Sequence, residues 1–98
     1  MTGSAASFVP SGGGNFSSLN ITSAAVVKAN PGVLVTITVL VAGAAGAAYD
    51  ATSTSGNTAA DQICVIPATV GIYTLQWPCF NGIVIAPGAS QVVSVAYS

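Results

Sequence analysis

Short runs of apolar residues, separated by turn residues, occupy the chain from residue 19 onward. The longest run covers residues 33–41 and is rich in β-branched side chains, which favour strands. It follows Asn30-Pro31-Gly32, a turn signal. Odd-numbered residues from Val33 to Val41 would share one face and even-numbered residues from Leu34 to Leu40 the other. Because both faces are mostly apolar, the run predicts a central strand with both sides covered.

The same pattern predicts several shorter strands and no long amphipathic helix. Pro78 should end the strand before it, and Pro87-Gly88-Ala89-Ser90 should form a hairpin turn between the last two strands. We therefore expect an all-β protein: a single β-sandwich or jelly-roll-like domain of six to eight short strands. Its core should come mainly from residues 33–41 and the last hairpin. The shorter strands are expected at residues 24–28, 47–51, 61–66, 72–77, 83–86 and 91–97.

Residues 1–18 differ from the rest because they are rich in Ser, Gly and Ala. We expect a flexible N-terminal arm at 1–18 and the β-sandwich domain at 19–98. The arm could be a disordered tail, or it could become ordered on a neighbouring subunit. The opening residues have no basic segment and no apolar core of a secretory signal, so we expect no signal peptide.

Residues 29–49 carry no charge and are long enough to span a membrane as a helix. The turn signal at 30–32, the β-branched residues and the alternating Thr36 and Thr38 favour a strand instead. The segment also lacks a basic flank and an aromatic belt. We therefore expect no membrane association, and a helical spectrum with partition into detergent would contradict this.

Charge is scarce: 3% of the 98 residues are charged, against about 25% in typical domains. The charged side chains are Lys28, Asp50 and Asp61, and there is no histidine. One cation cannot supply the phosphate contacts of a nucleic-acid-binding protein. Catalysis by a histidine base and a structural zinc site within one chain are excluded as well. A surface with so few charges indicates a protein that buries much of its exterior against other subunits.

Four groups of residues could carry chemistry. Cys64 and Cys79 could form a disulfide, but without secretion we expect free thiols. Asp50 and Asp61 could form a glycosidase-type carboxylate pair, although isolated acids are more often turn or solubility residues.

Lys28 could form a Schiff base if buried, or it could be an exposed strand-end residue or an ion-pair partner. Trp77 and Tyr73, with the distant Tyr49 and Tyr97, could form a sugar-binding platform or simply pack. We predict no enzyme activity, no cofactor, and no catalytic, cofactor-binding or metal site.

Two segments show a resemblance to a known group of proteins. One is Ala25-Val-Val-Lys28-Ala-Asn-Pro31-Gly32 followed by a long β-branched strand. The other is Trp77-Pro78-Cys79-Phe-Asn-Gly82-Ile-Val-Ile, then Pro87-Gly88 and residues 91–98. Over residues 20–98 the chain resembles small structural proteins of tailed bacteriophages, of the capsid decoration (cement) or head-accessory type. The resemblance implies a short β-sandwich or jelly-roll unit on the virion.

We therefore expect a non-enzymatic capsid decoration protein, made in the host cytoplasm, that binds and stabilises the phage capsid shell. It should form a symmetric homo-oligomer, a trimer being favoured, with the major capsid protein or other virion proteins as partners and with neither nucleic acid nor membrane. The alternative is a host-facing sugar-binding or adhesin module on a phage fibre. The decoration protein predicts a large apolar interface without a deep polar pocket. The adhesin predicts Trp77 or a tyrosine exposed in a concave site beside Asn, Gln or Asp.

Overall fold

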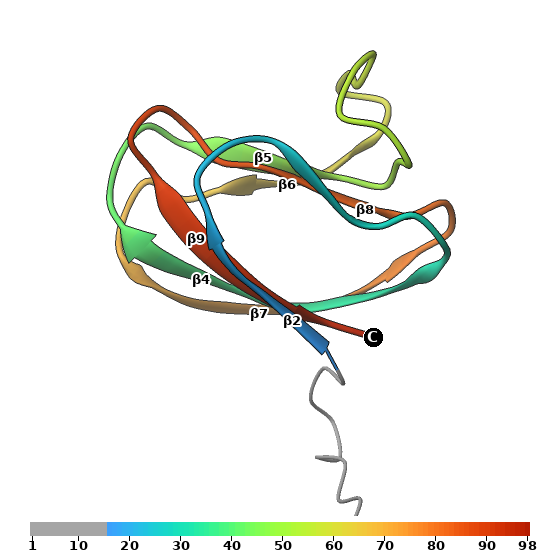
Figure 1. Ribbon diagram of the computed structural model, residues 1–98, viewed down its shortest axis with the longest axis horizontal. Helices are drawn as coiled ribbons and strands as arrows, with labels where there is room; N and C mark the ends of the chain where they lie inside the picture. The colour runs from blue at the N-terminus through green and yellow to red at the C-terminus, as the bar shows by residue number, and fades with distance from the viewer. Residues whose placement is uncertain (1–15) are drawn as a thin grey trace, which may run out of the picture.

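Two four-stranded antiparallel sheets face each other in the computed structural model, which describes residues 16–98 (Figure 1). The expected all-β fold is confirmed, and the described residues contain no helix. Side chains between the two sheets form one core, so the domain is a β-sandwich. The strands are β2 (Phe16–Ile21), β3 (Ala25–Lys28), β4 (Gly32–Val41), β5 (Gly46–Tyr49), β6 (Gln62–Ile66), β7 (Gly71–Cys79), β8 (Ile83–Ala86) and β9 (Val92–Tyr97).

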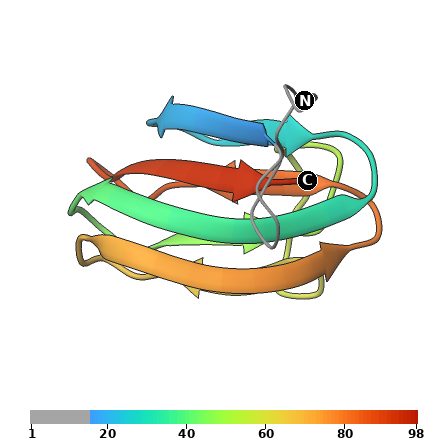
Figure 2. The same cartoon turned by 90° about the horizontal axis from the view of Figure 1, so that it is seen from below.

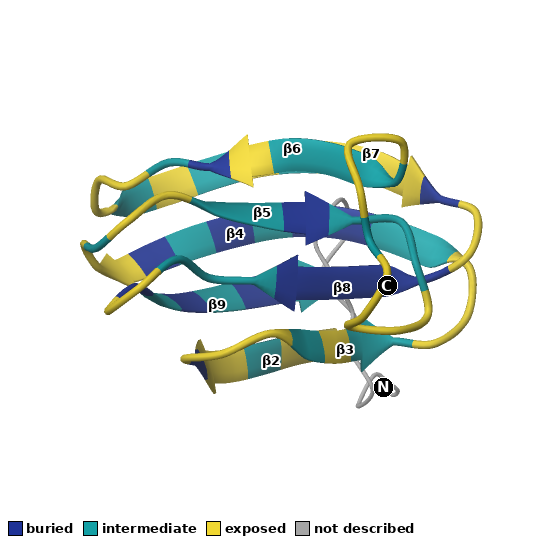
Figure 3. Cartoon of the chain, turned by 90° about the horizontal axis from the view of Figure 1, so that it is seen from above, coloured by how far each residue is buried: buried dark blue, intermediate teal, exposed yellow. Residues whose placement is uncertain are grey.

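One sheet has the strand order β2-β9-β4-β7 (Figure 2) and the other β3-β8-β5-β6 (Figure 3). The long strand β4 lies between β9 and β7, so its predicted central position is confirmed. The hairpin predicted around residues 87–90 is wrong, because β8 and β9 belong to different sheets. The chain crosses between the sheets there. Gly88 passes so close to the carbonyl of Ala44 that a side chain would collide with it.

The buried side chain of Gln91 holds this crossing in place. Only 1% of Gln91 is exposed. Its Nε2 donates to the carbonyl oxygen of Pro67 (2.8 Å), and its Oε1 accepts from the backbone N–H of Gly88 (3.1 Å). One side chain thus connects the segment before β9 to the segment after β6. Both the amide oxygen and the amide nitrogen of Gln91 have a hydrogen-bond partner, as buried polar groups require.

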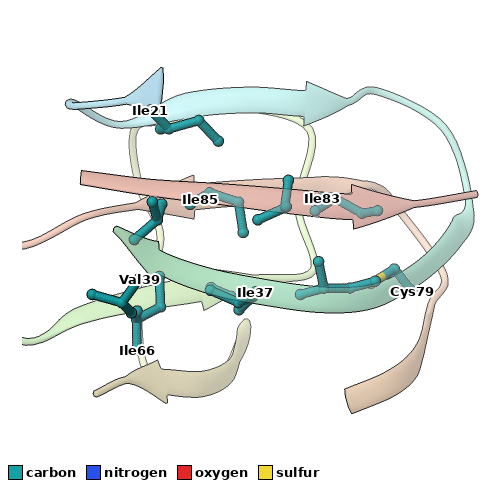
Figure 4. Close-up of a cluster of buried hydrophobic side chains, with 11 residues drawn as sticks. Ile21, Ile37, Val39, Ile66, Cys79, Ile83 and Ile85 are labelled. Carbon is teal, nitrogen blue, oxygen red and sulfur yellow. The ribbon is translucent and has the colours of Figure 1, made fainter. Parts of the chain in front are cut away.

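The core draws on both sheets, and β4, β8 and β9 supply much of it (Figure 4). The importance of β4 agrees with the sequence prediction, but the predicted division of its faces is wrong. Leu34 lies in the core cluster together with Ile37 and Val39, whereas Val35 does not. The register against β9 shifts between Leu34 and Thr36, which reverses the alternation at that point. The main core side chains are Leu34, Ile37, Val39, Ile83, Ile85, Val93 and Val95.

The outer face of β4 is only partly covered within the single chain. Leu40, on β4, is 49% exposed, and Ile72 on the neighbouring strand is 73% exposed. Thr38 and Ile72 are direct partners in the register, so they share a face of this sheet. The prediction that both sides of this strand are covered therefore does not hold for the chain on its own.

Each outer strand of the two sheets carries an extra residue relative to its inner neighbour. In β2 two residues between Ser18 and Ile21 face one residue of β9, and Asn20 has φ of 55°. In β7 two residues face Val35, and Gln76 has φ of 54°. Shifts of the same kind occur in β3 and β6, so β-bulges interrupt all four outer strands of the described sheets.

The predicted end of the N-terminal arm and the predicted end of β7 differ from the structure. Residues 16–18, assigned to the arm, lie in β2 and pair with β9, and the ring of Phe16 stacks on Tyr97 with centroids 5.8 Å apart. Residues 1–15 of the expected arm lie outside the described residues. Pro78 does not end its strand, because β7 continues to Cys79 and Pro78 pairs with Val33. A proline is tolerated there because β7 is an outer strand.

Candidate functional site

The segment at residues 50–61, between β5 and β6, and the turn at residues 80–82, between β7 and β8, lie at the same end of the sandwich (Figure 1). Of the polar and aromatic residues singled out in the sequence, Asp50, Asp61 and Trp77 lie here. Figure 3 shows the 50–61 segment crossing over the outer face of the sheet that contains β8. Two hollows open between the segment and the turn, and both are lined by Asp50, Asp61, Phe80 and Asn81.

Asp50 fixes the turn to the 50–61 segment. Its Oδ2 accepts a hydrogen bond from the backbone N–H of Phe80 (2.9 Å). Its Oδ1 accepts from the backbone N–H groups of Asn81 (2.7 Å) and Gly82 (3.2 Å). A single carboxylate thereby satisfies three successive backbone donors, an arrangement that favours the charged form.

The pKa of Asp50 reflects this arrangement. Burial on its own raises the pKa of Asp50, but the hydrogen bonds from Phe80, Asn81 and Gly82 outweigh burial and leave it below its ordinary value. Gly82 is required where the turn meets its neighbours, because a Cβ there would lie 2.5 Å from the carbonyl oxygen of Ala51 and 2.6 Å from that of Lys28. The turn is therefore held on one side by Asp50 and closely packed on the other.

The smaller hollow, which we call the Trp77 cleft, has a volume of about 290 Å³. Trp77 pairs with Leu34 in the register, so its side chain is on the inner face of β7, but β7 is an outer strand and 48% of Trp77 stays exposed. The ring of Phe80 is 78% exposed. The residues that line the Trp77 cleft are Asp50, Ala60, Asp61, Gln62, Ile63, Trp77, Pro78, Phe80 and Asn81.

The larger hollow, of about 420 Å³, lies against the Ser- and Thr-rich tip of the 50–61 segment. Hydrogen bonds within the segment hold this tip together. The Asn57 Nδ2 donates to the carbonyl oxygen of Ser53 (2.7 Å), and the backbone N–H of Ser55 donates to the Ser53 Oγ (3.2 Å). Gly56 supplies the left-handed conformation at the turn, with φ of 78°.

The structure brings Asp50 and Asp61 together. The backbone N–H of Asp50 donates to the carbonyl oxygen of Asp61 (2.9 Å), and both residues line the two hollows. A glycosidase pair needs one carboxylic acid with a raised pKa, whereas the pKa of Asp50 is lowered and both its oxygens accept backbone hydrogen bonds. Among residues 16–98, the Asp61 carboxylate has no hydrogen-bond or ion-pair partner. The geometry therefore gives Asp50 a structural role and leaves Asp61 available to a ligand.

The other candidate residues are dispersed. Tyr73 packs against the core and its hydroxyl donates to the carbonyl oxygen of Thr69 (3.0 Å). Tyr97 stacks on Phe16, and Tyr49 lies in β5, so no tyrosine lines the Trp77 cleft. Lys28 ends β3 and forms no ion pair with another described residue. The predicted platform of Trp77 with tyrosines is therefore not formed.

Phe80 and Asn81 are site residues that the sequence reasoning did not single out. They directly follow Trp77-Pro78-Cys79, in one of the two segments that carry the resemblance to phage structural proteins. An Asn-Gly pair between two apolar runs is a turn signal, and a large aromatic residue in a turn has little chance of being buried. The Asn81-Gly82 pair directly after Phe80 therefore predicts an exposed aromatic ring at this turn.

The two cysteines are free thiols. Cys79 is buried in the core cluster, and Cys64 packs against that cluster from β6. Burial raises the pKa of both thiols; for Cys79, burial and the charge of Asp50 outweigh a hydrogen bond from the backbone of Leu34 and raise it to about 11. Neither thiol is therefore suited to act as a nucleophile near neutral pH.

Cys79 should resist alkylation in the folded protein. At pH 8 its thiolate fraction is on the order of 100-fold below that of an unperturbed cysteine, and burial slows the reaction further. Mass spectrometry after timed exposure to iodoacetamide, with and without urea, measures this protection. Equal labelling of Cys79 in the folded and unfolded protein would contradict the assignment.

The comparisons with known proteins identify no relative. No family model, no curated protein and no solved structure matches this chain. Within the described residues there is no cluster of three or more His, Cys, Asp or Glu side chains that could hold a metal ion. Residues 16–98 also contain no helix long and apolar enough to cross a membrane. Function must therefore be inferred from the arrangement of the residues themselves.

Proposed function

We propose that this chain is a non-enzymatic structural subunit of a phage virion, of the capsid decoration type, that assembles as a symmetric homo-oligomer on the capsid shell. The observation that carries the proposal is the apolar exterior. Lys28, Asp50 and Asp61 are the only charges on an accessible surface of 5070 Å², roughly one per 1,700 Å². Large exposed apolar surface in a folded protein usually marks a protein contact. The resemblance of residues 20–98 to phage structural proteins points the same way.

The contact between copies is assigned to one group of exposed residues, Leu40, Val41, Val70 and Ile72, which we call the β4–β7 patch. Val39 pairs with Gly71, so these residues lie where the end of β4 meets the start of β7. Val70 is 63% exposed. The patch carries no charge, so contact with the same surface of another copy leaves no buried ion unpaired.

Sedimentation of the purified protein in low and high salt tests this assembly. We expect an oligomer that survives high salt, because salt screens charges and does not weaken apolar burial. Val70→Asp should dissociate it by placing a charge in the contact, whereas the matched variant Val65→Asp, at a similarly exposed valine of β6, should not. A wild-type monomer, or equal effects of both variants, would overturn this interface.

The place on the virion needs a separate experiment. Electron cryo-microscopy of particles from a phage that encodes this chain should show it at symmetric, stoichiometric positions on the capsid shell. Absence of the chain from purified particles, or its presence only on a fibre, would refute the decoration role.

A further inference from the structure

The Trp77 cleft combines exposed aromatic rings with polar side chains that have no hydrogen-bond partner among residues 16–98. About half of Trp77 and most of Phe80 are exposed, and Pro78 lies beside them in the lining. A sugar ring presents an apolar C–H face and a rim of hydroxyl groups, so it is held by a flat aromatic surface with a few polar groups at its edge. Exposed aromatic rings beside such polar groups provide both elements.

The polar side of the cleft consists of the Asp61 carboxylate and the side-chain amides of Gln62 and Asn81. Within the described part of the chain, none of these three side chains has a hydrogen-bond partner. A carboxylate accepts hydrogen bonds, and an amide both donates and accepts them. The set therefore matches hydroxyl groups, which can act as donor and acceptor at once.

The charges around the cleft select the class of ligand. Asp50 and Asp61 both line it, whereas Lys28, the only cation of the chain, does not. An anionic ligand would thus meet two negative charges with no compensating cation. The volume of about 290 Å³ lies near the lower end of small-molecule sites, which suits roughly one or two sugar rings.

The cleft is also organised in advance of binding. The Asp50 carboxylate fixes the backbone at Phe80, Asn81 and Gly82 through three hydrogen bonds. Gly82 packs closely against the carbonyl oxygens of Ala51 and Lys28. A ligand therefore does not have to order the turn, and less binding energy is lost to ordering.

We infer that the Trp77 cleft binds a neutral saccharide, with Trp77 and Phe80 as the stacking surface and Asp61 and Asn81 as hydrogen-bonding groups. This inference rests on other residues than the proposed capsid role, because the cleft and the β4–β7 patch are different sets. An exposed Trp77 beside Asp61, Gln62 and Asn81 is also the feature expected of the sugar-binding alternative. A saccharide site on a virion subunit would give the particle a contact with glycans in addition to its structural task.

The experiment uses the full chain and its single tryptophan, Trp77, as an internal reporter. Nuclear magnetic resonance titrations follow the indole N–H of Trp77 and the backbone amides of Asn81 and Gly82. The probes are methyl glycosides of glucose, galactose, mannose, rhamnose and N-acetylglucosamine, with sialic acid as the anionic probe. We expect saturable shifts at these signals with at least one neutral glycoside and weaker shifts with sialic acid.

The variants localise the site. Asp61→Asn should weaken binding by about tenfold, because it removes a charged hydrogen-bond acceptor. Phe80→Ala should weaken it as well, whereas the matched variant Phe16→Ala, at an exposed aromatic residue outside the cleft, should not. The inference is overturned if no neutral glycoside shifts the three signals, if sialic acid binds best, or if Asp61→Asn and Phe80→Ala bind as tightly as the wild type.

Discussion

Gln91→Leu is expected to lower the free energy of unfolding by about 2–4 kcal/mol. The leucine side chain has a similar size, so the loss comes from hydrogen bonding rather than from an empty space. In the wild type, Gln91 is 1% exposed and bonds to the N–H of Gly88 and the carbonyl oxygen of Pro67. The leucine leaves both of these backbone groups without that partner. Each buried group left without a partner costs about 1–3 kcal/mol. Urea denaturation followed by circular dichroism measures the difference.

Gln91→Glu separates hydrogen bonding from packing. At pH 7 the buried carboxylate would face the carbonyl oxygen of Pro67, to which Gln91 donates a hydrogen bond in the wild type. This placement raises the pKa of the introduced acid in the folded state. The loss of stability relative to the wild type should therefore be largest at neutral pH, and it should shrink as the pH falls through that raised pKa.

Gln62→Leu is the matched control for Gln91→Leu. Gln62 is half-buried in the Trp77 cleft, and among residues 16–98 its side chain has no hydrogen-bond partner. We expect its stability to stay within about 0.5 kcal/mol of the wild type. If Gln91→Leu were equally harmless, the assigned role of Gln91 in the crossing between the sheets would be refuted.

Asp50→Asn should cost about 2 kcal/mol of stability, because the amide offers one neutral oxygen where a carboxylate offers two charged ones to three N–H groups. The matched substitution is Asp61→Asn, whose carboxylate has no partner within the described residues. That variant should fold with nearly unchanged stability. Thermal denaturation of both variants at pH 7 provides the comparison.

The pH dependence carries a second signature of Asp50. Its folded-state pKa lies below its ordinary value of 3.8, so its stabilising contribution is complete above that value and disappears as the pH falls through the lower, folded-state pKa. The wild type should therefore lose stability in acid faster than Asp50→Asn does. Parallel acid profiles for the two proteins would show that the hydrogen bonds at the turn do not depend on charge.

Much of the strand content follows from local sequence. The β-branched run of β4 and the apolar residues of β8 appear as strands because their pattern fits a pleated, half-buried surface. Their sheet membership does not follow in the same way. Pro87-Gly88 predicts a turn equally well for a hairpin and for a crossing, and the decisive interactions of Gln91 and Gly88 involve residues far away in sequence.

The residues of the candidate site were partly visible in the sequence, but their grouping was not. Trp77, Asp50 and Asp61 stand out by type in a chain with one tryptophan and two acids. Asp50 reaches Asn81 across 31 positions, a contact that only the packing of the two sheets creates. The faces of β4 could not be predicted either, since a bulge shifts the alternation without leaving a signal in the apolar pattern.

The bulges in β2, β3, β6 and β7 also bear on whether copies of this protein can pair strand to strand into fibres. An outer strand exposes unpaired N–H and C=O groups that can template pairing with another chain, and many proteins block this with charged side chains. This chain has almost no charges to use, but each outer strand of its described sheets is irregular, and β7 also contains Pro78. A second copy would find only short stretches of regular strand to extend. Open-ended growth from strand to strand is thereby disfavoured, which agrees with the proposal that copies meet through a sheet face.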